Sequence, residues 1–409
     1  SENVIKCGSY VGNGSSTAGV EVGLGFEPQW IMLKRTDSSA NWQILNSMSG
    51  FGAYLEPNTS DAEDTNVTLS VSATGFKLLT SWGDVNASGG EYVYVACRRP
   101  DGYVGKPPEL GTDVFNMPLG LTDGTKPAFN TGFPVDFLIY KKPAVSGDWF
   151  TGARLIGTNY LEANNNVGQS TNANIQWDFQ DGMGGWSGLS SGYQSWGFKR
   201  HAGFDCICYK GTGTTHQIAH SLNKTVEMFW LKSRDSSANW MVWHKGLNGG
   251  TNPEQYFIRL NLTNAESQGS SFGDTAPTST HFTVGASSNA INTDGDDCIA
   301  MLFASVDGIS KVGSYTGNGS TTERTITLGF QPRFIIIKNA DGDYGNSWEV
   351  LDTTRGWGSG NDKRIWLDGN WAQDDSINVG APTSTGFTLT TDYTGMNANN
   401  NTYIYYAHA

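Results

Sequence analysis

Short apolar stretches that end in lysine recur along the chain at a nearly regular spacing. They cover residues 30–34, 137–141, 228–232 and 334–338. A tryptophan follows each stretch within ten residues. These marker tryptophans are Trp42, Trp149, Trp240 and Trp348. Apolar runs of about four to eight residues between turn residues are typical of buried β-strands. The pattern therefore predicts one strand-rich unit that is repeated four times.

Longer sequence identities support this repeat. The hexapeptide DSSANW occurs at 37–42 and again at 235–240. The marker tryptophans are 107, 91 and 108 residues apart. We therefore divide the chain into repeat 1 (residues 1–99), repeat 2 (100–202), repeat 3 (203–307) and repeat 4 (308–409). Repeat 2 diverges most, because its opening at 106–110 lacks the Tyr-x-Gly-x-Gly turn of the other repeats.

Each repeat has the pattern of six or seven short strands separated by turns rich in Gly, Asn and Ser. Phe387 and Leu389, and likewise Tyr403 and Tyr405, show the alternation of a half-buried strand. The expected fold is all-β, a tandem array of four related β-sandwich modules of the jelly-roll or immunoglobulin-like kind. A four-bladed propeller is the alternative, but each repeat is about twice the size of a usual blade. The linkers are short, so neighbouring modules are expected to touch.

Composition narrows the classes of function. The 409 residues carry a formal net charge of −13, and 16% of them are charged, against roughly 25% in an ordinary soluble domain. An acidic chain without a basic run is not expected to bind nucleic acid or an anionic membrane. No apolar run reaches the roughly 20 residues of a membrane span. The opening residues SENVIK contain neither an initiator Met nor a signal peptide, so we interpret the chain as a fragment or a processed product.

Side chains with catalytic or metal-binding chemistry are sparse. His216 and His220 lie in an extended segment, so they do not form a helical zinc pair. Repeat 4 has no histidine between 309 and 406, so an imidazole mechanism cannot be common to the repeats. Cys206 and Cys208 have a Cys-x-Cys spacing in a strand, and buried free thiols are the default interpretation. We therefore expect no enzyme activity and no cofactor.

Two acidic turns are weak candidates for calcium. Their carboxylates are Asp294, Asp296, Asp341 and Asp343. Oxygen-rich turns suit calcium, but neither turn continues into an EF-hand loop with its closing glutamate. A solvated hairpin turn is the simpler interpretation, so no metal is assigned.

Tryptophans outside the marker positions are the remaining candidates for a binding role. Trp186, Trp357, Trp366 and Trp371 lie among Gly, Asp and Asn residues and are candidates for binding a glycan or a partner. An indole ring can stack on a sugar while neighbouring polar groups bind its hydroxyls. Packing between modules or subunits uses aromatic side chains as well, so both interpretations stay open. If one module is specialised for binding, repeat 4 is preferred, because it holds three of these four residues.

Several motifs together resemble a known family. They are Tyr-x-Gly-Asn-Gly at 315–319, Gly-Phe-x-Pro-x-Phe-Ile-Ile-Ile-Lys at 329–338, Asn-Trp at 239–240, Ala-Pro-Thr-Ser-Thr-x-Phe-Thr at 276–283 and Asn-x-x-Gly-Gly-x-Tyr-x-Tyr at 86–94. In combination they resemble a repeated module in tail-fibre-like and other virion-surface proteins of marine tailed phages, of the cyanophage and pelagiphage type. The resemblance covers nearly the whole chain and brings no catalytic residues with it.

The resemblance implies a non-enzymatic structural protein of the virion surface, tail-fibre-like or decorating, that is assembled in the host cytoplasm. The implied partners are other virion proteins, further copies of the chain in a homo-oligomer with a trimer favoured, and a host cell-surface polysaccharide. A charge-poor surface suits seawater, where salt screens charges over a few ångström. The alternatives are a bacterial surface or secreted carbohydrate-binding adhesin and, less favoured, a glycan depolymerase spike with a carboxylate pair hidden in one module.

Overall fold

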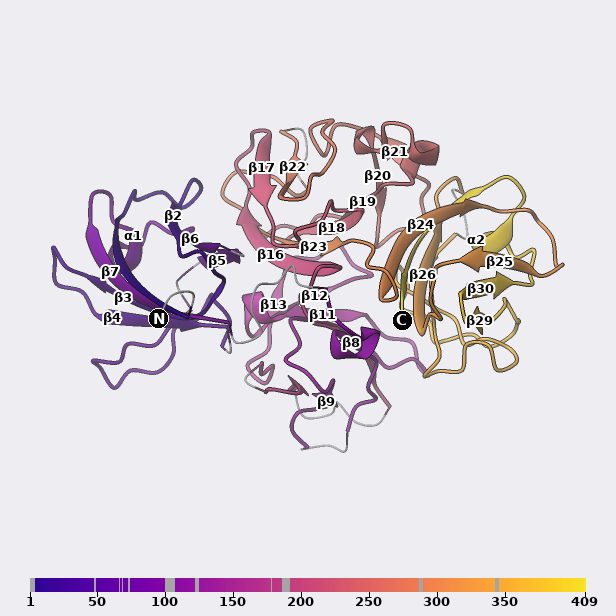
Figure 1. Cartoon of the computed structure of the whole chain (residues 1–409), viewed down its shortest axis with the longest axis horizontal. Coiled ribbons are helices and arrows are strands. Elements are labelled where there is room, and N and C mark those ends of the chain that lie inside the picture. Colours follow the sequence, from indigo (N-terminus) through magenta and orange to yellow (C-terminus); the bar gives the residue numbers. More distant parts are fainter. Residues whose placement is uncertain are drawn as a thin grey trace.

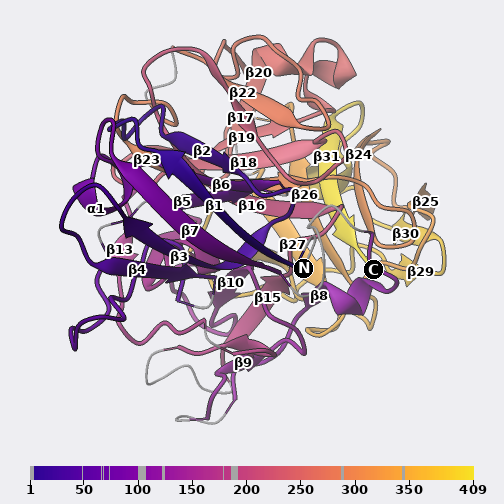
Figure 2. The same cartoon turned by 60° about the vertical axis from the view of Figure 1, so that its left-hand side comes forward.

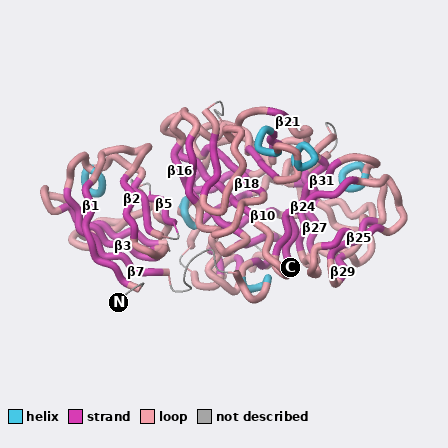
Figure 3. The backbone as a smooth tube through the Cα atoms, turned by 45° about the horizontal axis from the view of Figure 1, so that its top comes forward, coloured by secondary structure: helices cyan, strands magenta, loops and turns pink. Residues whose placement is uncertain are grey.

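The chain has an all-β fold. The structure, a computed structural model, describes residues 4–409 apart from 48, 66, 68, 73, 100–106, 122–124, 178, 186–191, 287–289 and 343–345. The helices of the described chain are short, as Figure 3 shows. They are α1 (Gly83–Asn86), α2 (Thr394–Asn397) and the 3-10 turns Gly111–Asp113, Arg154–Ile156, Leu247–Gly250 and Pro253–Gln255. Among the described residues, no helix has the length and apolar character needed to cross a membrane.

Repeat 1 shows the arrangement of strands that recurs in the rest of the chain. Its main sheet has the order β1 (Ile5–Val11), β7 (Glu91–Arg98), β3 (Pro28–Arg35), β4 (Trp42–Asn46). Its second sheet has the order β2 (Val20–Gly23), β6 (Gly75–Leu78), β5 (Leu69–Ser72). Ile31 and Leu33 of β3 point toward Phe76 and Val22 of the second sheet and form a buried cluster with them. The alternate residues of β3, Trp30 and Met32 among them, therefore face away from this cluster.

Repeats 2, 3 and 4 use the same strand order in their main sheets. Repeat 2 contains β8 (Phe115–Asn116), β9 (Phe129–Asn130), β10 (Phe137–Lys141), β11 (Phe150–Ala153), β12 (Asn159–Glu162), β13 (Ser170–Thr171), β14 (Gly182–Met183) and β15 (Gln194–Phe198). Repeat 3 contains β16 (Phe204–Lys210), β17 (His216–Ala219), β18 (Met228–Ser233), β19 (Met241–His244), β20 (Tyr256–Arg259), β21 (Ser267–Gln268), β22 (His281–Val284) and β23 (Asp297–Phe303). Repeat 4 contains β24 (Ser310–Thr316), β25 (Arg324–Thr327), β26 (Phe334–Asn339), β27 (Trp348–Asp352), β28 (Ile365–Trp366), β29 (Pro382–Thr383), β30 (Gly386–Leu389) and β31 (Thr402–His408).

In each repeat the first strand pairs with the last, the last pairs with the apolar strand that ends in lysine, and that strand pairs with the one at the marker tryptophan. The orders are β8-β15-β10-β11, β16-β23-β18-β19 and β24-β31-β26-β27. A smaller second sheet is present in every repeat, made of β9 and β14, of β17 and β22, and of β25, β30 and β29. All ladders in the described residues are antiparallel and join strands of one repeat. Each repeat thus holds two sheets, unlike the single sheet of a propeller blade.

Repeats 2, 3 and 4 share one hydrophobic core. It lies against the outward side of each main sheet, which is the side that faces away from the second sheet of the same repeat. It contains the fully buried indoles of Trp149, Trp196, Trp230, Trp240 and Trp348. Residues from all three repeats contribute, so the main sheets face one another around a common centre. In Figure 1, repeat 3 lies above repeat 2, and repeat 4 lies beside both. We call this arrangement the three-repeat ring.

Repeat 1 lies outside the three-repeat ring, as a lobe at the left of Figure 1. A buried ion network joins it to the ring. The Arg200 guanidinium of repeat 2 lies 2.7 Å from Glu27 of repeat 1 and 2.6 Å from Asp205 of repeat 3. Arg99 of repeat 1 lies 3.3 Å from Asp136 of repeat 2. Buried charges need partners of this kind, so the network holds repeat 1 in one orientation.

Candidate functional site

The marker tryptophans of repeats 2, 3 and 4 join the repeats to one another. Trp240 Nε1 donates to the carbonyl oxygen of Glu162 in repeat 2 at 2.9 Å. Trp348 Nε1 donates to the carbonyl of Arg259 in repeat 3 at 2.9 Å. Trp149 Nε1 donates to the carbonyl of Trp366 in repeat 4 at 2.7 Å. Each repeat therefore donates once and accepts once, and the set closes after three repeats. The three indoles that donate are fully buried, and an unpaired indole N–H would be costly there.

A lysine lies beside each of these tryptophans in the main sheet. Lys338 pairs with Trp348 across β26 and β27, and its Nζ donates to the carbonyl of Thr263 in repeat 3 at 3.2 Å. Lys141 Nζ donates to the carbonyl of Asn370 in repeat 4 at 3.1 Å. Burial lowers the pKa of Lys141 to about 8. The recurring lysine therefore contacts another repeat in repeats 2 and 4, whereas Lys232 of repeat 3 donates to the carbonyls of Ser233 and Ser236 in its own repeat.

Repeat 1 has the same face, and within the described chain that face has no covering repeat. Trp42 stands at the marker position of β4 and is half-buried, whereas Trp240 and Trp348 are fully buried. Leu55, which bridges Ile44 of β4, is 40% exposed, whereas Ile258, which pairs with the equivalent Val242 of repeat 3, is 1% exposed. Figure 2 shows β1, β7, β3 and β4 at the front of the molecule. An apolar sheet face of this kind is suited to a partner surface.

The exposed aromatic site predicted in repeat 4 lies at the junction between repeats 4 and 2. Trp371 is 52% exposed, and its ring meets Trp366 edge-on with the centroids 5.9 Å apart. The neighbouring carbonyl of Asn370 accepts a hydrogen bond from Gly147 N of repeat 2 at 2.7 Å. Gln373 N donates to the carbonyl of Pro143, also of repeat 2, at 2.7 Å. The segment that carries Trp371 is thus held by backbone contacts, while its indole ring faces solvent.

Two of the other predicted aromatic candidates, Trp357 and Trp186, are not seen at an exposed site in the described structure. Trp357 is 5% exposed and packs in the core of repeat 4 near Phe387, with ring centroids 6.1 Å apart. It offers no face to a ligand, which corrects the expectation that its ring is available for stacking. Trp186 lies outside the described residues.

Trp366 covers the carboxyl group of Glu349. Trp366 Nε1 donates to Glu349 Oε1 at 2.9 Å, and the Tyr393 hydroxyl donates to the same oxygen at 2.8 Å. Burial raises the pKa of Glu349 to about 7, against the attraction of Arg364. Such a pKa would suit a general acid, but Glu349 is fully buried. In this structure a polysaccharide has no access to its carboxyl group.

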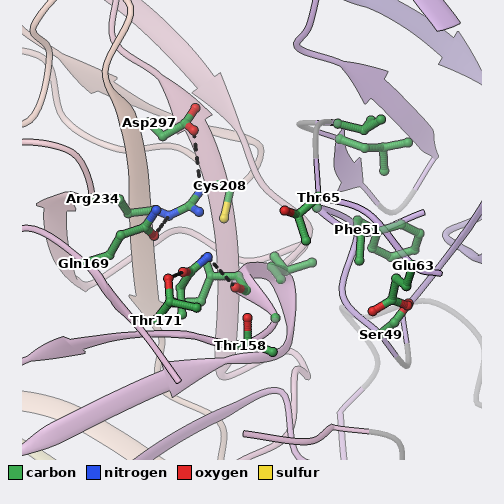
Figure 4. Close-up of a pocket in the computed structure, with 18 residues that line it drawn as sticks. Ser49, Phe51, Glu63, Thr65, Thr158, Gln169, Thr171, Cys208, Arg234 and Asp297 are labelled. Atoms are coloured by element: carbon green, nitrogen blue, oxygen red, sulfur yellow. Dashed lines mark hydrogen bonds and ion pairs between the residues drawn. The ribbon is translucent and has the colours of Figure 1, made fainter. Parts of the chain in front are cut away.

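A polar cavity of about 330 Å³ lies where repeats 1, 2 and 3 meet (Figure 4). Arg234 Nε donates to Gln169 Oε1 at 2.9 Å, and its guanidinium lies 4.0 Å from Asp297. Phe51 of repeat 1 forms part of the opposite wall. Burial raises the pKa of the lining thiol Cys208 to about 11, so this thiol is protonated at neutral pH and is a poor nucleophile. The lining suits water or a small polar molecule.

The acidic turns use their carboxylates as hydrogen-bond acceptors. Asp296 Oδ2 accepts from the hydroxyls of Ser233 at 2.9 Å and Ser236 at 2.6 Å. Asp341 Oδ2 accepts from Thr402 N at 2.5 Å. Asp294 is exposed in its turn, and Asp343 lies outside the described residues. Within the described part of the chain, no three His, Cys, Asp or Glu side chains are grouped so as to hold a metal ion.

Sequence reasoning treated the marker tryptophans as core residues of single modules and missed their contacts between repeats. The recurring lysines and the face of repeat 1 were missed as well. A usable signal was present in stretches such as 228–232 and 334–338, which are apolar at every position before the lysine. A strand that is apolar at every position is covered on both faces. A single two-layer module can cover only one face of its main sheet, so the other face must be covered by another module.

No protein in the curated collection matches the chain. A family model described as Domain of unknown function (DUF7483) matches residues 3–99 and 144–409. The stretch between the matched parts, 100–143, holds the divergent opening of repeat 2. Because the match covers most of the sequence, the chain belongs to the family Domain of unknown function (DUF7483).

Proposed function

We propose that this protein is a non-enzymatic structural protein of a phage virion surface, tail-fibre-like or decorating, which contacts a host cell-surface polysaccharide. Other virion proteins and further copies of the chain are its partners, and it is assembled in the host cytoplasm before it acts outside the cell. The motifs at 315–319 and 329–338 support the proposal through their resemblance to a repeated module of marine tailed-phage virion proteins.

The observation that carries the proposal is the closed set of tryptophan-to-carbonyl hydrogen bonds in the three-repeat ring. In three of the four similar modules the marker tryptophan binds a neighbouring module and lies in a core that the three modules share. A shared buried core of this size opposes local opening and proteolysis. Those are the properties that a protein exposed outside the cell needs, and they favour a structural role over a catalytic one.

The polysaccharide contact is assigned to Trp371. Its exposed indole and the edge of Trp366 form an aromatic surface with Asn370 and Gln373 beside it in the chain. Rings of this kind stack on the apolar faces of sugars, while amide groups bind the hydroxyls. The same surface supports the second candidate, a bacterial surface or secreted carbohydrate-binding adhesin.

The virion role is tested by immunogold electron microscopy with an antibody against this chain, on particles purified from the source of the sequence. We expect label on the outer surface of tailed particles. Label confined to bacterial envelopes or secreted material would favour the adhesin and reject the virion role.

The polysaccharide contact is tested with the full chain on an array of bacterial surface polysaccharides. Trp371→Ala is expected to weaken binding by at least about tenfold, as is typical when a central aromatic contact is truncated. Leu121→Ala, at an exposed leucine of repeat 2, is the control and should bind as the wild type does. Equal binding by both variants would reject Trp371 as the contact, and release of reducing ends from the bound polysaccharide would favour the depolymerase instead.

A further inference from the structure

The outward side of the main sheet of repeat 1 is an apolar surface without a partner in the described chain. We call it the open face. It is formed by Ile5, Met32, Trp42, Ile44, Leu55 and Val93. Several of these side chains are well exposed, which is unusual for a contiguous apolar patch on a soluble protein.

Strand register shows that the open face is equivalent to the surface that the three-repeat ring buries. In repeat 1, Cys7, Val95, Met32 and Ile44 stand side by side across the four strands. The same row in repeat 4 is Val312, Tyr406, Ile336 and Val350. The same row in repeat 3 is Cys206, Met301, Trp230 and Val242. Every member of the two latter rows is in the shared core.

Leu55 gives the sharpest comparison. It bridges Ile44 of β4, as Ile365 of β28 pairs with Val350 of β27. Leu55 is 40% exposed, whereas Ile365 is fully buried in the ring. The two residues occupy equivalent positions in the main sheets of their repeats. Their exposure therefore differs because a neighbouring repeat covers Ile365 and none covers Leu55 in the described chain.

Repeat 1 also keeps the hydrogen-bonding groups that join the ring. Trp42 N donates to Asn58 Oδ1 at 2.9 Å, as Trp240 N donates to Asn261 Oδ1 at 3.0 Å. This correspondence makes the Glu56 carbonyl the equivalent of the Arg259 carbonyl, which accepts from Trp348 in the ring.

The local turns around these two groups match as well. The Glu56 carbonyl accepts from Thr59 N at 3.0 Å, and the ring acceptor Glu162 accepts from Asn165 N at 3.3 Å in the same way. Across the described chain, Trp42 Nε1 donates no hydrogen bond of its own. Repeat 1 therefore presents one unused indole donor and the matching carbonyl acceptor on a single surface.

We propose that three copies of this chain associate through their open faces, so that three repeats 1 form a second ring built like the three-repeat ring. Trp42 Nε1 of each copy donates to the Glu56 carbonyl of the next, and Leu55 becomes buried. The contact is head-to-tail, and a head-to-tail contact closes when its rotation divides a full turn. Repeats 2, 3 and 4 close after three units with this same donor and acceptor.

Other occupants fit less well. The three-repeat ring of the same chain cannot take repeat 1, because its three donors and three acceptors already satisfy one another. A two-fold dimer would place like surfaces together and would not pair Trp42 with Glu56 in the way the ring does. The proposal does not depend on a virion role, since it rests on the geometry of the chain alone.

The test is the mass of the full chain in solution, measured by sedimentation velocity over a hundredfold range of concentration. We expect a species of three times 44.2 kDa. Leu55→Glu places a carboxylate in the centre of the contact and should yield folded monomer, with the β-sheet circular dichroism of the wild type. Leu121→Glu is the matched control, because Leu121 is 38% exposed and lies in repeat 2, away from the open face; it should remain trimeric.

A milder variant tests the hydrogen bond itself. Trp42→Phe keeps an aromatic ring but removes the Nε1 donor together with part of the indole, so each contact should weaken at least about fivefold and the trimer should dissociate at higher concentration than the wild type. A wild-type chain that stays monomeric or forms dimers throughout the range would overturn the proposal. A trimer that persists in Leu55→Glu would overturn it too, because the contact would then lie elsewhere.

Discussion

The indole Nε1 of Trp240 in repeat 3 lies 2.9 Å from the backbone carbonyl oxygen of Glu162 in repeat 2 and donates a hydrogen bond to it. The two residues belong to different modules: Trp240 lies in the shared core, and the chain neighbours of Glu162, Leu161 and Ala163, lie in the same core. This relationship recurs at Trp348 and Trp149, so three modules with separate sheets are joined through the same atom pair. We therefore expect the three repeats of the ring to unfold cooperatively and not as independent domains.

The first prediction concerns this hydrogen bond. Trp240→Phe removes the donor, and Trp243→Phe removes the same volume from another buried position whose Nε1 has no partner in the described structure. A hydrogen bond of this type contributes about 1 kcal/mol, so Trp240→Phe should be less stable than Trp243→Phe by about that amount. Urea unfolding followed by fluorescence measures the difference, and equal midpoints would contradict a role for the bond.

The second prediction separates core from surface in repeat 4. Trp357→Ala leaves a cavity in a buried cluster and should lower the free energy of unfolding by about 3–5 kcal/mol. Trp371→Ala removes an exposed ring and should cost less than about 1 kcal/mol. Thermal unfolding of both variants checks the order. If Trp371→Ala were the more damaging, its segment would be a structural part of the junction with repeat 2.

The third prediction uses the buried carboxyl group of Glu349, whose pKa burial raises to about 7. The folded state keeps this proton while the unfolded state releases it near pH 4.5. The contribution of Glu349 to stability is therefore complete below pH 4.5 and is lost as the pH rises through 7. Relative to Glu349→Gln, the wild type should lose about 3 kcal/mol over this interval.

Chemical denaturation at several pH values measures this difference. The variant Glu323→Gln, at an exposed glutamate of the same repeat, is the control and should follow the wild type at each pH. A wild-type profile parallel to that of Glu349→Gln would mean that the carboxyl group ionises in the folded protein as it does in water.

The fourth prediction concerns the loss of folding stability at acidic pH that is caused by the buried side chain of His244. Burial lowers the pKa of His244 to about 3, and its Nδ1 accepts a hydrogen bond from Gly246 N at 2.9 Å, which requires the neutral ring. The unfolded state binds a proton below about pH 6.5 while the folded state does not, so stability is lost as the pH falls from 6.5 toward 3. Between pH 7 and 4.5 the wild type should lose about 2–3 kcal/mol more than His244→Gln.

His281→Gln is the control for this experiment. His281 lies half-buried at the edge of the second sheet of repeat 3, where its ring Nδ1 is 2.9 Å from the Thr280 hydroxyl. Acid should destabilise this variant as much as it destabilises the wild type. If both histidine variants lost equal stability on acidification, the buried ring of His244 would not be the group that responds.

Much of the fold could be predicted from local patterns. The apolar stretches, the marker tryptophans and the Gly-rich turns predicted an all-β fold of short strands that recur along the chain, because alternation and turn chemistry depend on neighbours in the chain. Of the aromatic binding candidates in repeat 4, Trp371 is exposed and Trp357 is buried. The sequence could not separate them, since a tryptophan among Gly and Ser residues looks the same whether a distant sheet covers it or not.

The hexapeptide DSSANW marks the limit of what local sequence determines. It is identical at 37–42 and 235–240, and in both places it leads into a strand that pairs with the apolar strand before it. The sequence by itself determined that both tryptophans stand at the equivalent position in the main sheet of their own repeat. Only the tertiary structure decided that Trp240 is sealed in a core and bonded to Glu162 while Trp42 faces outward. The physical reason is that burial depends on which other surface arrives, and six identical residues cannot encode two different neighbours.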